Sequence, residues 1–319
     1  MRVSTSQIFN SATIGMQNRQ YDLYKLQNQM STGRRVLTPA DDPIAASQAL
    51  LITQSQGLNA QFTKNIGDAN SKLNLLDSTL SGINDELQAI YEKAVDAGNA
   101  SYSPEQRGAI AVELKQRLEN LIGLGNTKDG TGLYIFSGYK TSTQPFQVDA
   151  GATPPYALGS GTYVQYKGDG GVESLQVSPS KTVDTSANGL DVFMQVRDGN
   201  GNPTGRSIFD SVKNMVDLLD PTSGIPFNSA SYGQALDDTA AMISHISTLR
   251  SSVGGRMQGL DNLANTASEK DYQYQSRLSD LQDLDWIDAY SRFSQLQLQL
   301  QATQLAFRQT SQLSLFSIL

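Results

Sequence analysis

The sequence predicts a mainly α-helical protein with a β insert, in which the N- and C-terminal segments form a long antiparallel helical bundle or coiled coil. Two observations predict this fold class. Apolar residues recur every seven positions over long stretches towards both ends of the 319-residue chain. Between these stretches, residues 126–204 are rich in Gly, Thr, Pro and Tyr and carry short alternating runs, which indicate a small β-rich outer domain.

The first expected element is a helix over roughly the first thirty residues. Large apolar side chains are spaced seven apart, with small or apolar residues at the intermediate positions, and this pattern predicts a narrow coiled-coil seam. The seam residues are Phe9, Met16, Leu23 and Met30.

The segment QMSTGRRVLTPADDPIAAS (residues 29–47) is expected to be a joint between two helices. Its glycine and prolines interrupt helical patterning, either aspartate can cap the next helix, and the last proline suits the first position of that helix. The two arginines can hydrogen-bond the last carbonyls of the first helix or pair with the aspartates. An active site is the competing interpretation, but no further acidic, Lys or His cluster completes one. The joint residues are Gly33, Arg34, Arg35, Pro39, Asp41, Asp42 and Pro43.

The strongest heptads begin at Phe62 and predict a helix over 62–97, about 54 Å long at 1.5 Å per residue. The sequence SPEQ at 103–106 is typical of a capping box with Pro104 at the first helical position, so another helix is expected to start there. Helical patterning returns from about residue 205.

The β insert is predicted to contain strands in 132–146, 161–171 and 172–180, separated by glycine turns. The segment DGNGNPTGRSIF begins like a calcium loop at Asp198. Its sixth position is Pro203 and its twelfth is Phe209, where a calcium loop needs Gly and Glu, so a hairpin turn is expected instead.

The last helix carries two apolar stripes on roughly opposite faces. A surface helix of a globular domain needs only one apolar face, so two stripes predict burial on both sides, through pairing within the chain and lateral packing against neighbouring copies. One stripe is Trp286, Phe293, Leu300 and Phe307; the other is Ile287, Leu298 and Leu305.

Composition excludes several functions. A net charge of −7 without any basic run argues against nucleic-acid binding, and the absence of cysteine excludes disulfides, thiolate metal sites and cysteine nucleophiles. The sequence contains no window of 18 apolar residues, so no membrane span is expected. The N-terminus lacks the apolar core of a secretory signal peptide. The single histidine, His245, has no partner for zinc or a catalytic triad, so no enzyme activity, metal or cofactor is expected.

Several segments together carry a family resemblance. They are the opening MRVSTSQIF, the joint segment, GLYIFSGYKTSTQPF, RSSVGGRMQGLDN, LSDLQDLDWIDAYSRFSQLQ and the closing LSLFSIL. With these, the chain resembles the flagellin superfamily, and within it the hook-associated protein 3 (FlgL-type) family of hook–filament junction proteins. In the joint segment the match includes Ser31, Gly33, Arg35, Pro39, Asp41, Asp42, Pro43 and Ala45.

The resemblance implies a structural subunit, secreted through the flagellar type III export apparatus with the help of an export chaperone. Copies of it would form a homo-oligomeric ring at the hook–filament junction, between hook-associated protein 1 and flagellin. A minor flagellin of the filament is the alternative within this superfamily. A secreted binding module acting through the β insert is the alternative outside it.

A flagellin-like division into three parts is expected from the resemblance and the patterning together. Residues 1–45 with 275–319 would form a terminal coiled-coil domain in the inner tube layer. Residues 46–130 with 205–274 would form a helical bundle domain with a β-hairpin, and residues 131–204 a variable outer domain.

Overall fold

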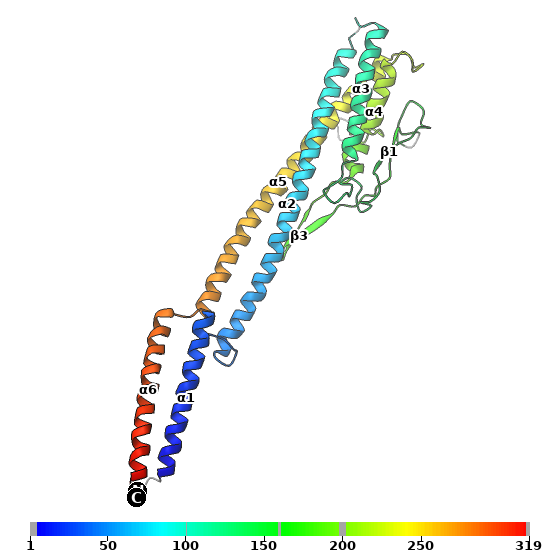
Figure 1. Cartoon of the computed structure of the whole chain (residues 1–319). Helices are drawn as coiled ribbons and strands as arrows, with labels where there is room; N and C mark the ends of the chain where they lie inside the picture. Colours follow the sequence, from blue (N-terminus) through cyan, green and yellow to red (C-terminus); the bar gives the residue numbers. More distant parts are fainter. Residues whose placement is uncertain (1–4, 100, 159–160, 198–201, 317–319) are drawn as a thin grey trace. The chain divides into compact units, whose positions relative to one another are not determined.

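The heptad patterning becomes long helices in the computed structural model, which describes residues 5–99, 101–158, 161–197 and 202–316 (Figure 1). The chain divides into a terminal unit, Met1–Ala60 with Ser268–Leu319, and a central unit, Gln61–Ala267. The expected division has three parts with different boundaries, and it stays a prediction.

The terminal unit pairs the two ends of the sequence. Helices α1 (Thr5–Thr32) and α6 (Trp286–Phe316) lie side by side and antiparallel (Figure 1). The rings of Phe9 and Phe307 are 4.9 Å apart between centroids, and the Arg19 guanidinium donates a hydrogen bond to the side-chain carbonyl of Gln299. The unit also contains the beginning of α2 (Pro43–Ala97) and the end of α5 (Ser229–Gln282).

The central unit buries the strongest heptads. In the part of α2 that belongs to this unit, Leu73, Leu80 and Leu87 are fully buried together with apolar residues of α3 (Pro104–Gly125), α4 (Ile208–Leu219) and α5. The helix expected over 62–97 is the later part of α2, which already begins at Pro43. The predicted capping box is present at the start of α3, where Ser103 and Gln106 each bind the backbone N–H of the other.

Two short hairpins form the β region. Strand β1 (Phe146–Val148) pairs antiparallel with β2 (Val164–Tyr166), with Phe146 opposite Tyr166. Strand β3 (Ser174–Ser178) pairs antiparallel with β4 (Lys181–Asp184), with a bulge between Gln176 and Ser178.

The expectation of a strand over most of 132–146 was wrong, because this stretch folds into turns. The carboxylate of Asp129 accepts hydrogen bonds from the backbone N–H groups of Thr131 and Leu133, at 2.8 and 2.9 Å, and so folds the chain back on itself. Gly132 and Gly138 then adopt positive φ angles of 87° and 69°, which a strand does not use.

An aromatic cluster fastens the β region to the helices of the central unit. Phe146 of β1 lies 4.8 Å from Phe193 and 5.2 Å from Phe209 of α4, measured between ring centroids. The helical turn η1 (Leu190–Met194) supplies Phe193, and all three rings are fully buried. At Gly125, the last residue of α3, a Cβ atom would come within 2.8 Å of the Phe146 ring, so only glycine fits there without a shift.

The calcium-like segment starts outside the described residues, which resume at Asn202 after Arg197. Arg197 and Pro203 form an antiparallel bridge across it. Phe209, at the position where a calcium loop needs a carboxylate, is a member of the aromatic cluster.

Candidate assembly site

The joint segment begins where α1 stops. Gly33 has a φ of +68°, and the backbone N–H of Arg34 donates to the carbonyl of Gln29 at 3.2 Å. This six-to-one bond following a left-handed glycine is a Schellman motif, which ends a helix by satisfying a carbonyl of its last turn.

Asp42 begins the next helix. One carboxylate oxygen accepts the backbone N–H of Ala45 at 3.0 Å, which makes Asp42 the N-cap of α2 and places Pro43 at the first helical position. The other oxygen pairs with the Arg35 guanidinium at 3.2 Å. The Ala45 N–H, and then Arg35, hold the pKa of Asp42 below its usual value.

Asp41 has a separate partner. Its carboxylate pairs with Lys25 of α1 at 2.6 Å and accepts the backbone N–H groups of Thr38 and Leu37 at 2.8 and 3.1 Å. The hydrogen bond from Lys25 is the largest cause, and that from Thr38 the next, of a pKa for Asp41 far below its usual value. The sequence pattern predicted that Asp41 pairs with the arginines. It did not indicate Lys25, which lies 16 positions away and shares no local pattern with Asp41.

Arg35 fastens the joint to the C-terminal part of the chain. Its guanidinium donates to the carbonyl of Leu281 at 2.9 Å, and its backbone N–H donates to the carbonyl of Gln282 at 2.6 Å. The backbone N–H of Leu284 donates to the carbonyl of Gly33 at 2.9 Å. The arginines were expected to reach either the last carbonyls of α1 or the aspartates of the joint. Arg35 pairs with Asp42 and also binds carbonyls at the end of α5, which the sequence did not predict.

The connection between α5 and α6 is therefore held by the joint. It ends at Asp285, whose carboxylate accepts the backbone N–H of Ile287 at 2.9 Å and starts α6. Within the terminal unit, one side of the joint carries the end of α1 and the start of α2, and the other side carries the end of α5 and the start of α6. Of the remaining predicted joint residues, Arg34 forms a backbone bridge with Asp283, and Pro39 is exposed.

The seam residues of α1 and the first stripe of α6 lie along the helix pair. All of them except Phe9 and Trp286 are half-buried within the chain, although the ring of Phe9 still contacts that of Phe307. The half-buried residues are Met16, Leu23, Met30, Phe293, Leu300 and Phe307.

The second stripe of α6 is open to solvent. Ile287 is 87% exposed, Leu298 68% and Leu305 62%, and Trp286 of the first stripe is itself 55% exposed. Large apolar side chains are also exposed elsewhere in the terminal unit. These are Ile14, Tyr21 and Tyr24 on α1, Ile44, Leu50, Leu51 and Leu58 on α2, Tyr272 on α5 and Tyr290 on α6. Apolar surface on this scale marks an interaction site.

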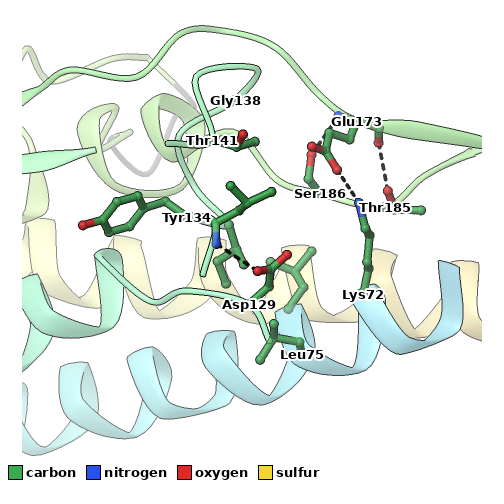
Figure 2. A pocket seen from close by; sticks show the side chains of 12 residues that line it. Lys72, Leu75, Asp129, Tyr134, Gly138, Thr141, Glu173, Thr185 and Ser186 are labelled. Carbon is green, nitrogen blue, oxygen red and sulfur yellow. Dashed lines mark hydrogen bonds and ion pairs between the residues drawn. The ribbon is translucent and has the colours of Figure 1, made fainter. Parts of the chain in front are cut away.

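A small cavity of about 60 Å³ lies between α2 and the β region of the central unit (Figure 2). Its charged groups are engaged with one another or with the backbone. Lys72 pairs with Glu173 at 2.6 Å, and Asp129 binds the turn that follows it. The cavity has room for about two waters. Its charged side chains have a structural role, because their contacts link α2 to the β region.

No metal-binding cluster forms within the described residues. Among them, no three His, Cys, Asp or Glu residues converge in a way that could hold a metal ion. Nε2 of His245 lies 3.0 Å from the carbonyl oxygen of Asp191, a contact between α5 and η1. None of the described helices has a segment long and apolar enough to cross a membrane.

Comparison with known proteins identifies the family from the sequence. Residues 3–141 match the family model of the bacterial flagellin N-terminal helical region. Flagellar hook-associated protein 3 of Escherichia coli is 32% identical over 330 aligned residues, which cover 100% of this chain and 99% of that protein. The Salmonella typhimurium protein of the same name is 32% identical with the same coverage. Flagellin of Aquifex aeolicus is 30% identical over only 34% of this chain.

Solved structures share the fold. Flagellar hook associated protein-3 from Legionella pneumophila superimposes with a TM-score of 0.64 over 73% of this chain and 98% of that chain, at 21% identity. FlgL of Xanthomonas campestris gives 0.60 over 72% of this chain, at 19% identity.

These observations define a structural protein of the bacterial flagellum, mainly helical, with a small β region and with terminal helices that expose apolar side chains. The relatives that match over their full length distinguish it from flagellin itself. The chain belongs to the flagellar hook-associated protein 3 family, whose place is the hook–filament junction. A minor flagellin is not favoured, because curated flagellins match only part of the chain.

Proposed function

We propose that copies of this chain form a ring in the junction, with hook-associated protein 1 on one side and flagellin on the other. The observation that carries the proposal is the two-sided terminal helix α6. One stripe packs on α1 of the same chain, and the second stripe stays exposed until another subunit covers it. In a ring, every copy has neighbouring copies that can cover its exposed stripe.

In this proposal the seam and both stripes are the assembly interface, and the joint segment sets how the terminal helices are presented. Segments 1–45 and 275–319 form the inner tube layer, and segment 131–204 belongs to the variable outer domain. The Arg35–Asp42 pair and the Arg35–Leu281 bond support this role, because together they tie the joint to both halves of the terminal unit.

Export through the flagellar type III apparatus, with a chaperone on the C-terminal helix, is the second part of the proposal. The exposed stripe of α6 supports it, since Ile287, Leu298 and Leu305 need a cover between synthesis and assembly. A chain without cysteine also suits a location outside the cell.

The test is charge reversal in the joint. Arg35→Glu puts a second negative charge beside Asp42 and removes the donor to the Leu281 carbonyl. We therefore expect a monomer that folds but assembles poorly, and cells that lose flagellin into the medium. The measurement is flagellin in culture supernatant against flagellin in filaments, together with circular dichroism of the purified monomer. Lys64→Glu, at an exposed site of the central unit, is the matched control.

The double variant Arg35→Glu/Asp42→Arg restores the pair in reverse. Partial recovery of filaments by this double variant would assign the defect to the pair itself. Normal filaments in the Arg35→Glu single variant would contradict the role given to the joint.

A further inference from the structure

The first part of α2, within the terminal unit, presents an apolar face to solvent. Ile44, Leu51 and Leu58 are spaced seven apart, so they lie nearly in line along the helix, over about 21 Å at 1.5 Å per residue. Leu50 and Gly57 form a second line beside the first. All five residues are exposed, and each of the four apolar side chains is more than half open to solvent. We call these five residues the α2 face.

We propose that the α2 face packs against the exposed stripe of α6 on a second copy of this chain. The inference rests on the ring proposed above and names the surface that covers the stripe in it. Each copy would offer its α6 stripe to one neighbour and its α2 face to the other. Such a contact repeats head to tail and closes into a ring when the rotation between copies allows it.

The α2 face lies in a stretch of helix without charge. No charged residue occurs between Asp42 and Lys64, whereas the rest of α2, from Lys64 to Ala97, carries nine. A helix that stays in water is normally charged on its exposed side, and charged residues are depleted at the centre of protein interfaces. The chain itself buries the opposite side of this stretch, at Ala45 and Ala49. The first part of α2 therefore has the composition of a helix that is covered on both sides.

The exposed stripe of α6 matches the α2 face in composition and in spacing. No charged residue occurs between Arg292 and Arg308, and Leu298 and Leu305 repeat at the same interval of seven. Two helices with the same seven-residue apolar repeat can pack along their length, because side chains of one fit between those of the other. The shared repeat favours α6 of another copy as the partner of the α2 face.

Hydroxyl groups in both stretches are already hydrogen-bonded within their own helix. Thr53 and Ser55 on α2 each donate to the backbone carbonyl four residues earlier, at 2.8 and 2.9 Å. Thr303 on α6 does the same at 2.7 Å. Because a buried polar group without a partner is costly, these internal bonds suit both surfaces to being covered by a second helix.

Gly57 independently indicates a close neighbour. Glycine inside a helix lowers its stability relative to other residues. Among the described residues, a Cβ atom at Gly57 would have nothing within 4 Å, so packing within the chain gives no reason for glycine there. A missing side chain on the α2 face does allow the backbone of a second helix to approach closely.

The first experiment substitutes this glycine. Gly57→Gln keeps the surface uncharged and improves helix propensity, so urea unfolding of the monomer should occur at the same or a higher urea concentration. In cells that lack the native protein, we expect this variant to lose filaments and to release flagellin into the medium. Gly67→Gln, in the charged part of α2 and with equally open surroundings, is the matched control and should support filaments. A defect in both variants, or in neither, would overturn the proposal.

The second experiment identifies the partner by photo-cross-linking in assembled junctions. p-Benzoylphenylalanine in place of Leu51 should give, on illumination, a product of twice the chain mass, with the adduct mapped by mass spectrometry to residues 293–307. The same replacement at Val95, an exposed apolar position in the charged part of α2, should give no such product. Cross-linking from Leu51 to flagellin or to hook-associated protein 1 would overturn the proposal.

The reciprocal replacement at Leu298 separates this inference from the proposed ring. We expect its adduct to map to residues 43–63 of a second copy. A product of two copies that joins Leu298 to any other segment would overturn the α2 contact and leave the ring in place. If neither position gave a product of two copies in intact junctions, the ring itself would be wrong.

Discussion

The central and terminal units use the same heptad pattern with opposite results. In the central unit Leu73, Leu80 and Leu87 are fully buried, because α3, α4, α5 and the β region enclose that part of α2. In the terminal unit α6 packs on α1 with one stripe, and Ile287 and Leu298 on its second stripe remain in solvent. A heptad pattern therefore marks a side chain as suited to burial, and the arrangement of the other helices decides whether the chain itself buries it.

Truncation of the central seam should have the largest effect on the free monomer. We expect Leu80→Ala to lower the free energy of unfolding by about 2–5 kcal/mol, since it leaves a cavity in an enclosed core. Urea unfolding measured by circular dichroism is the test. Leu298→Ala on α6 is the matched control, with an expected change within about 0.5 kcal/mol. Equal losses in both variants would remove the distinction between the units.

The buried ion pair of the central unit should come next. We expect Asp238→Ala to cost about 1.5–3 kcal/mol, because the partly buried Arg206 guanidinium loses its charge-assisted hydrogen bonds. Asp288→Ala, which breaks the exposed pair with Arg292 on α6, should cost no more than about 0.5 kcal/mol. Thermal unfolding of the two variants gives the comparison, and a small loss in the first would show that water reaches the Arg206 site.

Substitutions in the exposed stripe of α6 should have little effect on monomer stability and a large effect on assembly. The triple variant Ile287→Ser/Leu298→Ser/Leu305→Ser should unfold at the same urea concentration as the native monomer and stay monomeric in sedimentation. In cells that lack the native protein, it should fail to support filaments. Val112→Ser, at an exposed apolar position on α3, should assemble normally. If the triple variant assembles, the stripe is not the interface.

Acid should produce the smallest effect, and it should act on the joint. The pKa values of Asp41 and Asp42 are lowered in the folded chain, mainly by Lys25 and by the Ala45 N–H respectively. Their contribution to stability is therefore present above the unfolded-state value of about 4 and is lost as the pH falls below it. Hydrogen exchange of the joint amides between pH 6 and pH 3 measures the loss. Asp41→Asn should flatten the pH dependence, and an unchanged profile would contradict the assignment.

Local patterns predicted much of the fold. The long helices follow from apolar spacing, and the start of α3 follows from the pattern of Ser103, Pro104 and Gln106. In the joint, the cap by Asp42 and the stop at Gly33 also depend on neighbouring residues only, so the sequence was sufficient for them.

Contacts between distant residues could not be predicted in this way. The Arg35 bond to Leu281 joins residues 246 positions apart, and the Arg206–Asp238 pair joins residues 32 apart. In neither case does the sequence spacing single out these two partners from the many other possible donor–acceptor pairs. The turns after Asp129 were mistaken for a strand, because their aromatic and β-branched residues also suit strands.

The pairing of Phe9 with Phe307 joins residues almost at opposite ends of the sequence. Such a contact has a very long sequence separation, and closing so large a loop costs entropy before any contact compensates for it. The terminal helices can pair only after nearly the whole polypeptide is free to fold, whichever end emerges first. Sequence separation therefore delays the pairing of the two terminal helices until nearly the whole chain is available, and it would keep them apart during the export proposed above.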